Sequence, residues 1–249
     1  MPILENGPVK IHYEEAGSGF PLLVQPGGGL EATIAGLDNH AFNPLEEFCD
    51  IHHVAALDLR NANNGSSEGP LDIERNWDAF TDDQLALADH LGFDKFLVIG
   101  FCIGGPMIWN LLKRAGDRVA GAVLVHPSGY ISSHPNIFYE NNMAGWAPPF
   151  CARREDVTME MVSDFLNNMY TKRADFVFTV DLDFVRTCQT PVLVLPDDIP
   201  AHPYATAMET ALLAPNAQVS LYPWKENDRK IRLAVQHIKM FLQANTPAS

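Results

Sequence analysis

The sequence predicts an α/β fold with a mostly parallel central sheet flanked by helices. Short apolar runs bounded by Gly, Pro or Asp recur along the chain, and segments with helical periodicity lie between them. Strands and helices that alternate in this way are typical of βαβ units, whose strands pair in parallel. The length of 249 residues suits a single domain of this class.

Three strands are predicted in the first quarter of the chain. Residues 9–16 alternate apolar and polar side chains, as an exposed strand does, and the turn Gly17-Ser18-Gly19 leads into a short buried strand at residues 21–25. A Gly-rich loop at residues 26–29 follows this strand. The third strand, at residues 53–60, ends in a polar loop.

The same alternation continues to the end of the chain. A helix is predicted over residues 77–91, where Gly92 ends it, and a second helix over residues 107–114, before Gly116. The other predicted elements are strands at residues 95–99, 119–125, 191–195 and 218–222 and a closing helix at residues 229–242.

The segment between residues 125 and 191 does not follow this alternation. It is rich in Met, Phe, Trp and Asn. We expect a helical lid over residues 128–186, inserted into a core that consists of residues 1–127 and 187–249. The alternative is an ordinary helical excursion that does not contact a functional site.

Composition argues against several kinds of partner. The formal net charge is −14, so nucleic acid and anionic membrane surfaces are not expected to bind. No run of about 18 apolar residues predicts a membrane span, and the first residues lack the features of a secretory signal. We therefore expect a cytoplasmic protein that acts on a small-molecule substrate. A homodimer is compatible with the sequence, which does not fix the oligomeric state.

The four cysteines show no paired spacing of the kind that metal sites use. Free thiols are expected, and the scattered His and Asp residues give no metal site either. We expect neither a metal nor a cofactor. The cysteines are Cys49, Cys102, Cys151 and Cys188.

Cys102 lies where a predicted strand passes into a helix, within the sequence Gly-Phe-Cys-Ile-Gly-Gly. A nucleophile on such a sharp turn needs small residues two positions before and after it, because the strand and the helix come very close there. Gly100 and Gly104 meet this requirement, so the pattern predicts that Cys102 is a nucleophile. The alternative is a Gly-rich turn with a thiol that only packs in the core.

The helix that follows Cys102 indicates how its thiol is activated. Free N–H groups and the positive end of the dipole at a helix N-terminus stabilise a thiolate, which is the attacking species in acyl transfer. The N–H of Ile103 is one expected oxyanion donor. Gly28, in the Gly-rich loop, is the expected second donor.

Taken together, these segments resemble the α/β-hydrolase superfamily, and they occur in the family's order. Residues 56–67 are similar to its Asp-Leu-Arg-Gly-x-Gly-x-Ser motif, with Asn61 in place of the first glycine. The cysteine at the elbow resembles dienelactone-hydrolase-like members, whereas the rest of the chain is closer to lidded esterases and C–C hydrolases. The segments that carry the resemblance are residues 22–28, 56–67, 99–105 and 191–198.

The resemblance implies an acid after the strand that ends at Leu195 and a base after the last strand. Asp197 and Asp198 occupy the place of the acid, and spacing favours Asp198. The place of the base, residues 223–228, contains no histidine. This departure puts the family's usual triad in doubt.

Two histidines are candidates to replace the missing base. His202 lies on the loop that carries the acid, and His126 directly follows a strand, at the sheet edge where sites lie in open α/β folds. We take His202 as the base and keep His126 as its alternative. A thiol, with a reference pKa of about 8.5, depends less on a base than a serine hydroxyl does.

The expected pocket is mostly apolar, with His126, Trp146 and Trp224 as substrate contacts. The predicted function is hydrolysis of an ester, lactone, thioester or activated C–C bond in a medium-sized apolar carbonyl compound. Cys102, His202 and Asp198 would form the triad. The alternatives are a lyase, isomerase or cyclase on the same fold, or a ligand-binding homologue without turnover, because a fold does not fix a function.

Overall fold

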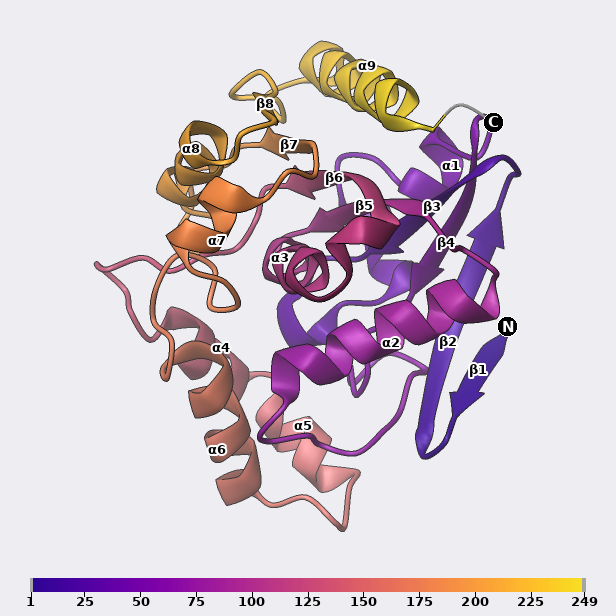
Figure 1. The fold of residues 1–249 in the computed structure, drawn as a ribbon. Helices are drawn as coiled ribbons and strands as arrows, with labels where there is room; N and C mark the ends of the chain where they lie inside the picture. The colour runs from indigo at the N-terminus through magenta and orange to yellow at the C-terminus, as the bar shows by residue number, and fades with distance from the viewer. Residues whose placement is uncertain (1, 248–249) are drawn as a thin grey trace.

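A central eight-stranded sheet organises the computed structural model, which describes residues 2–247 (Figure 1). The strand order is β1-β2-β4-β3-β5-β6-β7-β8. β1 and β2 are antiparallel to their neighbours, and the strands from β4 to β8 pair in parallel. The strands are β1 (Ile3–Asn6), β2 (Val9–Ala16), β3 (Phe20–Gln25), β4 (His52–Leu57), β5 (Phe96–Phe101), β6 (Val119–Val125), β7 (Val192–Leu195) and β8 (Ala217–Val219).

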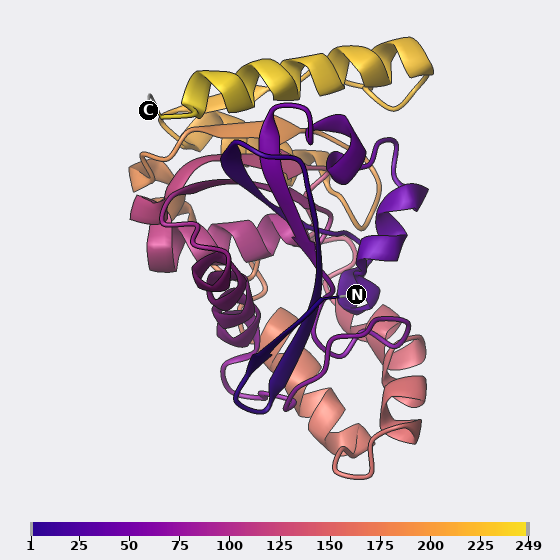
Figure 2. The same ribbon diagram turned by 90° about the vertical axis from the view of Figure 1, so that its right-hand side faces the viewer.

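Helices cover both faces of the sheet, as Figures 1 and 2 show. On one face lie α2 (Asn76–His90), α3 (Gly104–Ala115), α7 (Leu182–Thr187) and α8 (Tyr204–Leu213). On the other face lie α1 (Pro44–Glu47) and α9 (Asp228–Asn245). Short 3-10 turns occur at Gly29–Glu31, Ile34–Asn39 and Gly116–Arg118.

The central strands are apolar throughout because both of their faces are buried. In β5, Phe96 and Val98 pack toward α2 and α3, whereas Leu97 and Ile99 pack toward α9. Successive side chains of a strand point to opposite faces, so each face of the sheet receives its own apolar set. This confirms the predicted α/β class with a mostly parallel sheet.

Two predicted strands are shorter in the structure. The strand expected at residues 53–60 ends at Leu57, because the Asp58 carboxylate accepts hydrogen bonds from the backbone N–H groups of Ile34 and Ser66, at 2.8 and 2.9 Å. The strand expected at residues 218–222 ends at Val219 as β8. β1, α1 and α8 were not expected from the sequence.

Three further helices, α4 (Ile137–Ala144), α5 (Ala147–Ala152) and α6 (Met159–Tyr170), lie between β6 and β7 in the chain. They gather beside α2 at one end of the molecule (Figure 1), and their apolar side chains share one cluster with Trp77 and Phe80 of α2. α7 crosses the expected boundary at residue 186 and packs against α8 instead.

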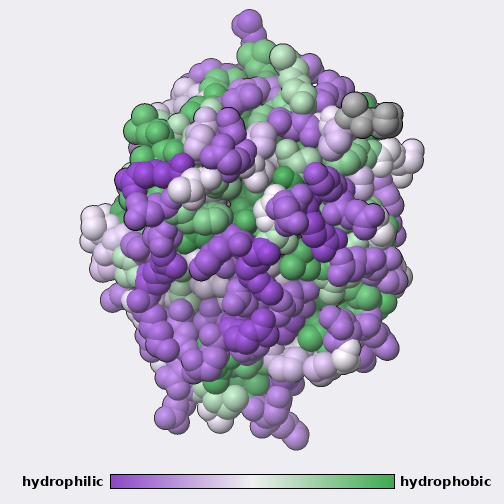
Figure 3. Space-filling view, in the orientation of Figure 1, coloured by the Kyte–Doolittle hydropathy of each residue, from purple (hydrophilic) through white to green (hydrophobic). Residues whose placement is uncertain are grey.

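No helix in the part of the chain that the structure describes is both long enough and apolar enough to cross a bilayer. On the face drawn in Figure 3, polar side chains predominate and apolar ones lie between them. Single exposed apolar residues such as Leu212 and Met240 are ordinary on a protein surface.

Candidate active site

Cys102 lies at the sharp turn between β5 and α3, and its backbone has a φ of 53°. This left-handed conformation costs a non-glycine residue about 1–3 kcal/mol, so neighbouring contacts must hold it. The Cys102 N–H donates to the carbonyl of Val125 at 3.1 Å, and the Cys102 carbonyl accepts from the N–H groups of Gly105 and Ser128 at 3.0 and 2.9 Å. These bonds tie the turn to β6 and to the loop after it.

The glycines near Cys102 allow three segments to approach one another. A Cβ atom on Gly100 would lie 2.8 Å from Cδ1 of Ile108, and one on Gly105 would lie 2.5 Å from Cβ of Pro127. Carbon atoms in a packed interior do not come this close without displacing each other. The expected need for small residues around Cys102 is therefore met by the geometry.

The Cys102 thiol contacts a hydroxyl, and a nearby imidazole influences its ionisation. Its Sγ lies 3.2 Å from Oγ of Ser128. Burial raises the pKa of Cys102. The nearby imidazole of His202, helped by Ser128 and by the Gly28 N–H, outweighs burial and lowers the pKa to about 7. A large share of the thiol is then ionised at neutral pH.

His202 lies on the loop between β7 and α8, which folds back on itself. The His202 N–H donates to the carbonyl of Ile199 at 2.9 Å. Its Nδ1 lies 3.0 Å from Oδ2 of Asp197, and since a carboxylate only accepts, Nδ1 carries the proton. The buried Nε2 has no hydrogen-bond partner among the described residues. Burial lowers the pKa of His202, but Cys102 and Asp197 raise it, and the net shift is upward.

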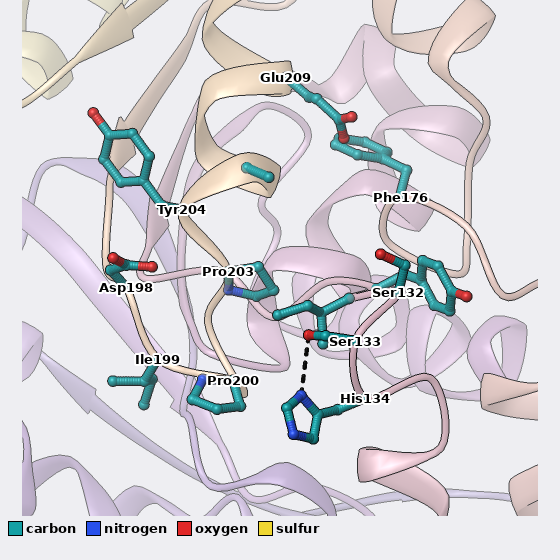
Figure 4. A pocket seen from close by; sticks show the side chains of 13 residues that line it. Ser132, Ser133, His134, Phe176, Asp198, Ile199, Pro200, Pro203, Tyr204 and Glu209 are labelled. Carbon is teal, nitrogen blue, oxygen red and sulfur yellow. Dashed lines mark hydrogen bonds between the residues drawn. The ribbon is translucent and has the colours of Figure 1, made fainter.

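The carboxylate at His202 is Asp197, so the expectation of Asp198 is wrong. Asp197 is buried, whereas Asp198 is exposed and lines a groove on the outer side of the loop (Figure 4). Adjacent side chains on an extended backbone point to opposite sides, so only one of two consecutive acids can face His202. Spacing along the sequence could not decide which one it is.

Lys225 binds the same carboxylate oxygen as His202 does. Its Nζ lies 2.5 Å from Oδ2 of Asp197. Burial raises the pKa of Asp197, but hydrogen bonds from Lys225 and His202 and the charge of the ammonium outweigh burial and lower it. Asp197 is therefore ionised at neutral pH. Lys225 follows β8, where the family resemblance places the base.

Gly28 and Ile103, the two expected oxyanion donors, adjoin Cys102. Gly28 has a φ of 125°, which glycine adopts far more readily than other residues, and its N–H helps to lower the pKa of Cys102. Ile103 immediately precedes α3. Within residues 2–247 no backbone carbonyl or side chain accepts its N–H. Both N–H groups can therefore donate to a substrate oxygen beside the sulfur.

The fold and the strained turn fit one family, and a family model described as the alpha/beta hydrolase fold matches residues 21–246. This chain belongs to the α/β-hydrolase family. The match extends over nearly the whole chain, including the inserted helices.

Solved structures support the same fold for this α/β-hydrolase. A meta-cleavage product hydrolase from Pseudomonas fluorescens IP01 is 18% identical, with a TM-score of 0.69 and 95% of both chains covered. A serine hydrolase from Cycloclasticus zankles is also 18% identical, with a TM-score of 0.73 and 99% of both chains covered. Identities this low establish the fold and nothing finer.

Two curated relatives match over shorter stretches. A 2-hydroxymuconate semialdehyde hydrolase from Pseudomonas sp. (strain CF600) is 27% identical over 146 residues, which are 59% of this chain and 49% of that protein. Epoxide hydrolase 3 from Xenopus tropicalis is 28% identical over 104 residues, 39% of this chain and 28% of that protein. The chain thus spans about half or less of the length of these relatives.

His126, the alternative base, packs against His202 in this α/β-hydrolase. The ring centroids of the two histidines are 4.6 Å apart, and the Trp224 ring lies parallel to His126 within 6° at 5.9 Å. Burial, followed by the charges of His202 and Lys225, keeps the pKa of His126 well below its usual value. A neutral His126 therefore supports the ring of His202, while the contact that lowers the pKa of Cys102 comes from His202.

Trp146 and Trp224, expected as substrate contacts, are packing residues in the structure. The Trp146 Nε1–H donates to the carbonyl of Asn61 at 3.0 Å, and its ring stacks on Phe150 at 4.5 Å. The Trp224 Nε1–H donates to the carbonyl of Pro196 at 2.8 Å. Both side chains are almost wholly buried, and neither lines the cavity beside Cys102. Tryptophan content alone could not distinguish a pocket wall from a core.

A narrow cavity lies beside Cys102 with room for about one water molecule. Two of its polar residues, Ser128 and Tyr170, were missed by the sequence analysis. Ser128 lies three positions after the end of β6, at the sheet edge where sites are expected, so the strand-end rule could have indicated it. Nothing in the sequence indicated Tyr170. The lining residues are Gly29, Trp77, Ile103, Pro106, Ser128, Phe138, Tyr170 and Phe178.

A larger and more open groove of about 560 Å³ lies on the outer side of the His202 loop (Figure 4). Ile199, Pro200 and Pro203 of that loop form one side, and Ser133 and His134 lie across from them. Neither this groove nor any other part of the described chain gathers three or more His, Cys, Asp or Glu side chains as metal ligands would be gathered.

Proposed function

We propose that this α/β-hydrolase cleaves an ester, lactone, thioester or activated C–C bond in a medium-sized apolar carbonyl compound, with Cys102 as the nucleophile. The observation that supports this most is the position of Cys102 on the strained turn, against His202, which is held by Asp197. The names of the relatives, a semialdehyde hydrolase and a meta-cleavage product hydrolase, are compatible with this chemistry.

The first step forms an acyl-enzyme. The Cys102 thiolate attacks the carbonyl carbon, a C–S bond forms, and the carbonyl π electrons move onto oxygen. The N–H groups of Gly28 and Ile103 stabilise that oxyanion. The oxyanion then collapses, and the bond to the leaving group breaks with its electron pair. His202 donates the proton on Nε2 to the leaving group.

The second step releases the acid. His202 takes a proton from water through Nε2, the water oxygen attacks the thioester carbon, and the C–S bond breaks to return the Cys102 thiolate. Asp197 holds His202 with its proton on Nδ1 throughout, so that Nε2 alone exchanges protons. Serine fills the role of the thiol in the α/β-hydrolase relative named a serine hydrolase.

We also propose that α4, α5 and α6 form a lid over this site. Phe138 of α4 and Tyr170 of α6 line the cavity beside Cys102, so the inserted helices contribute directly to its walls. A cavity with room for about one water cannot admit a substrate unless these helices move.

The proposal is tested by incubating the protein with para-nitrophenyl esters and lactones and measuring both turnover and the mass of the peptide that contains Cys102. We expect an acyl adduct on Cys102. Cys102→Ala should lower kcat/KM at least about a thousandfold. Cys151→Ser is the matched control, because Cys151 lies on α5 outside the cavity lining.

Two other outcomes would overturn the hydrolase. Turnover of a carbonyl compound without an acyl-enzyme or a hydrolysed product would identify a lyase, isomerase or cyclase. Tight binding of a small molecule without conversion, with the same affinity in Cys102→Ala as in the wild type, would identify a ligand-binding protein.

A further inference from the structure

The cavity beside Cys102 is covered by three aromatic rings that all contact one another. Phe138 stacks on Tyr170 with centroids 5.4 Å apart, and Phe178 meets the edge or face of each, at 5.5 Å from Phe138 and 5.3 Å from Tyr170. The rings come from α4, from the last residue of α6, and from the segment before α7. A substrate that displaces this cover meets flat aromatic faces, which favour flat, unsaturated or aromatic groups.

Tyr170 is the member of this trio that carries a polar group. Only 2% of the residue is exposed. Burial raises the pKa of Tyr170, and charge on Cys102 raises it further, while a hydrogen bond from Asn142 lowers it. The net shift is upward, so the hydroxyl keeps its proton at neutral pH. Tyr170 lines the same cavity as Ser128, whose Oγ lies 3.2 Å from the Cys102 sulfur.

The proton of this hydroxyl is free to meet a ligand. The neighbouring Asn142 amide N–H donates to the carbonyl of Phe138 at 2.7 Å. No acceptor within residues 2–247 takes the Tyr170 proton. Because Tyr170 lines the cavity, a substrate atom there can accept this hydrogen bond and gain affinity.

The other polar groups around the cavity are donors or already have partners. The Trp77 Nε1–H donates to the carbonyl of Met169 at 3.1 Å. Ser128 is paired with Cys102, and the N–H of Ile103 faces the position of the oxyanion. The cavity therefore presents hydrogen-bond donors, so a ligand that matches it carries acceptors. The reacting carbonyl is only one of these acceptors.

We propose that Tyr170 determines the acyl specificity of the enzyme by donating a hydrogen bond to a second oxygen atom, keto, enol or hydroxyl, on a flat unsaturated or aromatic acyl group. This inference rests on the proposed acyl transfer at Cys102. The first carbonyl of the substrate reacts with the sulfur, and the second oxygen lies under the lid against Tyr170.

The test compares para-nitrophenyl benzoate with its ortho-, meta- and para-formyl derivatives, which place one carbonyl oxygen at three positions on the ring. The wild-type enzyme should prefer at least one formyl isomer. Tyr170→Phe removes only the hydroxyl and should lower the preference for that isomer over the unsubstituted ester about tenfold. Thermal melting checks that the variant is folded.

Tyr139→Phe is the matched control, because the Tyr139 hydroxyl pairs with Oγ of Ser163 at 2.9 Å and does not line the cavity. It should leave the preference as it is in the wild type. An unchanged preference in Tyr170→Phe, with acyl-Cys102 still formed from the unsubstituted ester, would overturn this inference alone. Absence of acyl-Cys102 with every ester would overturn the proposed function and this inference with it.

Discussion

Replacing Asp197 with asparagine removes the charge that holds His202 while keeping the size of the side chain. The hydrogen bond from His202 Nδ1, 3.0 Å long, would lose its charged acceptor. A hydrogen bond to a charged group is worth about 1.5–3 kcal/mol. Since each 1.36 kcal/mol is a factor of ten in rate, kcat/KM for aryl-ester hydrolysis should fall roughly 10- to 150-fold.

The same variant should also shift the pH dependence. Asp197 raises the pKa of His202, so without Asp197 the imidazole holds its proton less firmly. The imidazolium is among the causes that lower the pKa of Cys102 to about 7. In the wild type, kcat/KM and the rate of alkylation by iodoacetamide should rise with pH through about 7 as the thiolate forms. In Asp197→Asn both curves should move to higher pH.

Asp198→Asn is the control for this experiment, because it makes the same chemical change one residue away, on a side chain that faces the outer groove. It should change kcat/KM less than about twofold, as surface substitutions usually do. The reasoning is refuted if Asp198→Asn shows the large loss and Asp197→Asn keeps full activity with an unshifted pH curve.

Two other substitutions test the ion pair at Asp197 and the close packing near Cys102. Lys225→Met should change kcat/KM at most about fivefold, since a partly exposed ion pair is worth about 0.2–1 kcal/mol; complete loss would instead make Lys225 the base. Gly105→Ala should lower the free energy of unfolding by about 1–3 kcal/mol, measured by urea denaturation, because its Cβ would lie 2.5 Å from Pro127. Gly116→Ala, whose Cβ would find only one atom within 4 Å, at 3.9 Å, should be tolerated, and equal destabilisation of both variants would contradict the steric argument.

The turn at Cys102 was predictable because its causes are local. Strand, tight turn and helix are neighbours in the chain, and the required small residues stand two positions on either side of the cysteine. Gly28 could be named for a similar reason, because its loop directly follows a buried strand and glycine can adopt the positive φ that the turn uses there. The N–H of Ile103 could be named as a donor because Ile103 immediately precedes α3.

The rest of the site depends on contacts between distant segments. His202 and His126 were both candidates, and the pairing of His202 with Asp197 depends on how the loop after β7 folds back through Ile199. Ser128 reaches Cys102 only because β6 lies next to β5 in the sheet.

The sequence by itself determined the α/β class, the alternation of strands and helices and the sharp turn at Cys102, because periodicity and glycine spacing act within a few residues of the chain. Only the tertiary structure decided which of two adjacent acids faces His202, which tryptophans are core, and that Tyr170 lines the cavity beside Cys102. Those outcomes depend on the direction in which a side chain points from a folded loop or helix. That direction is set by packing against residues that are far away in the sequence.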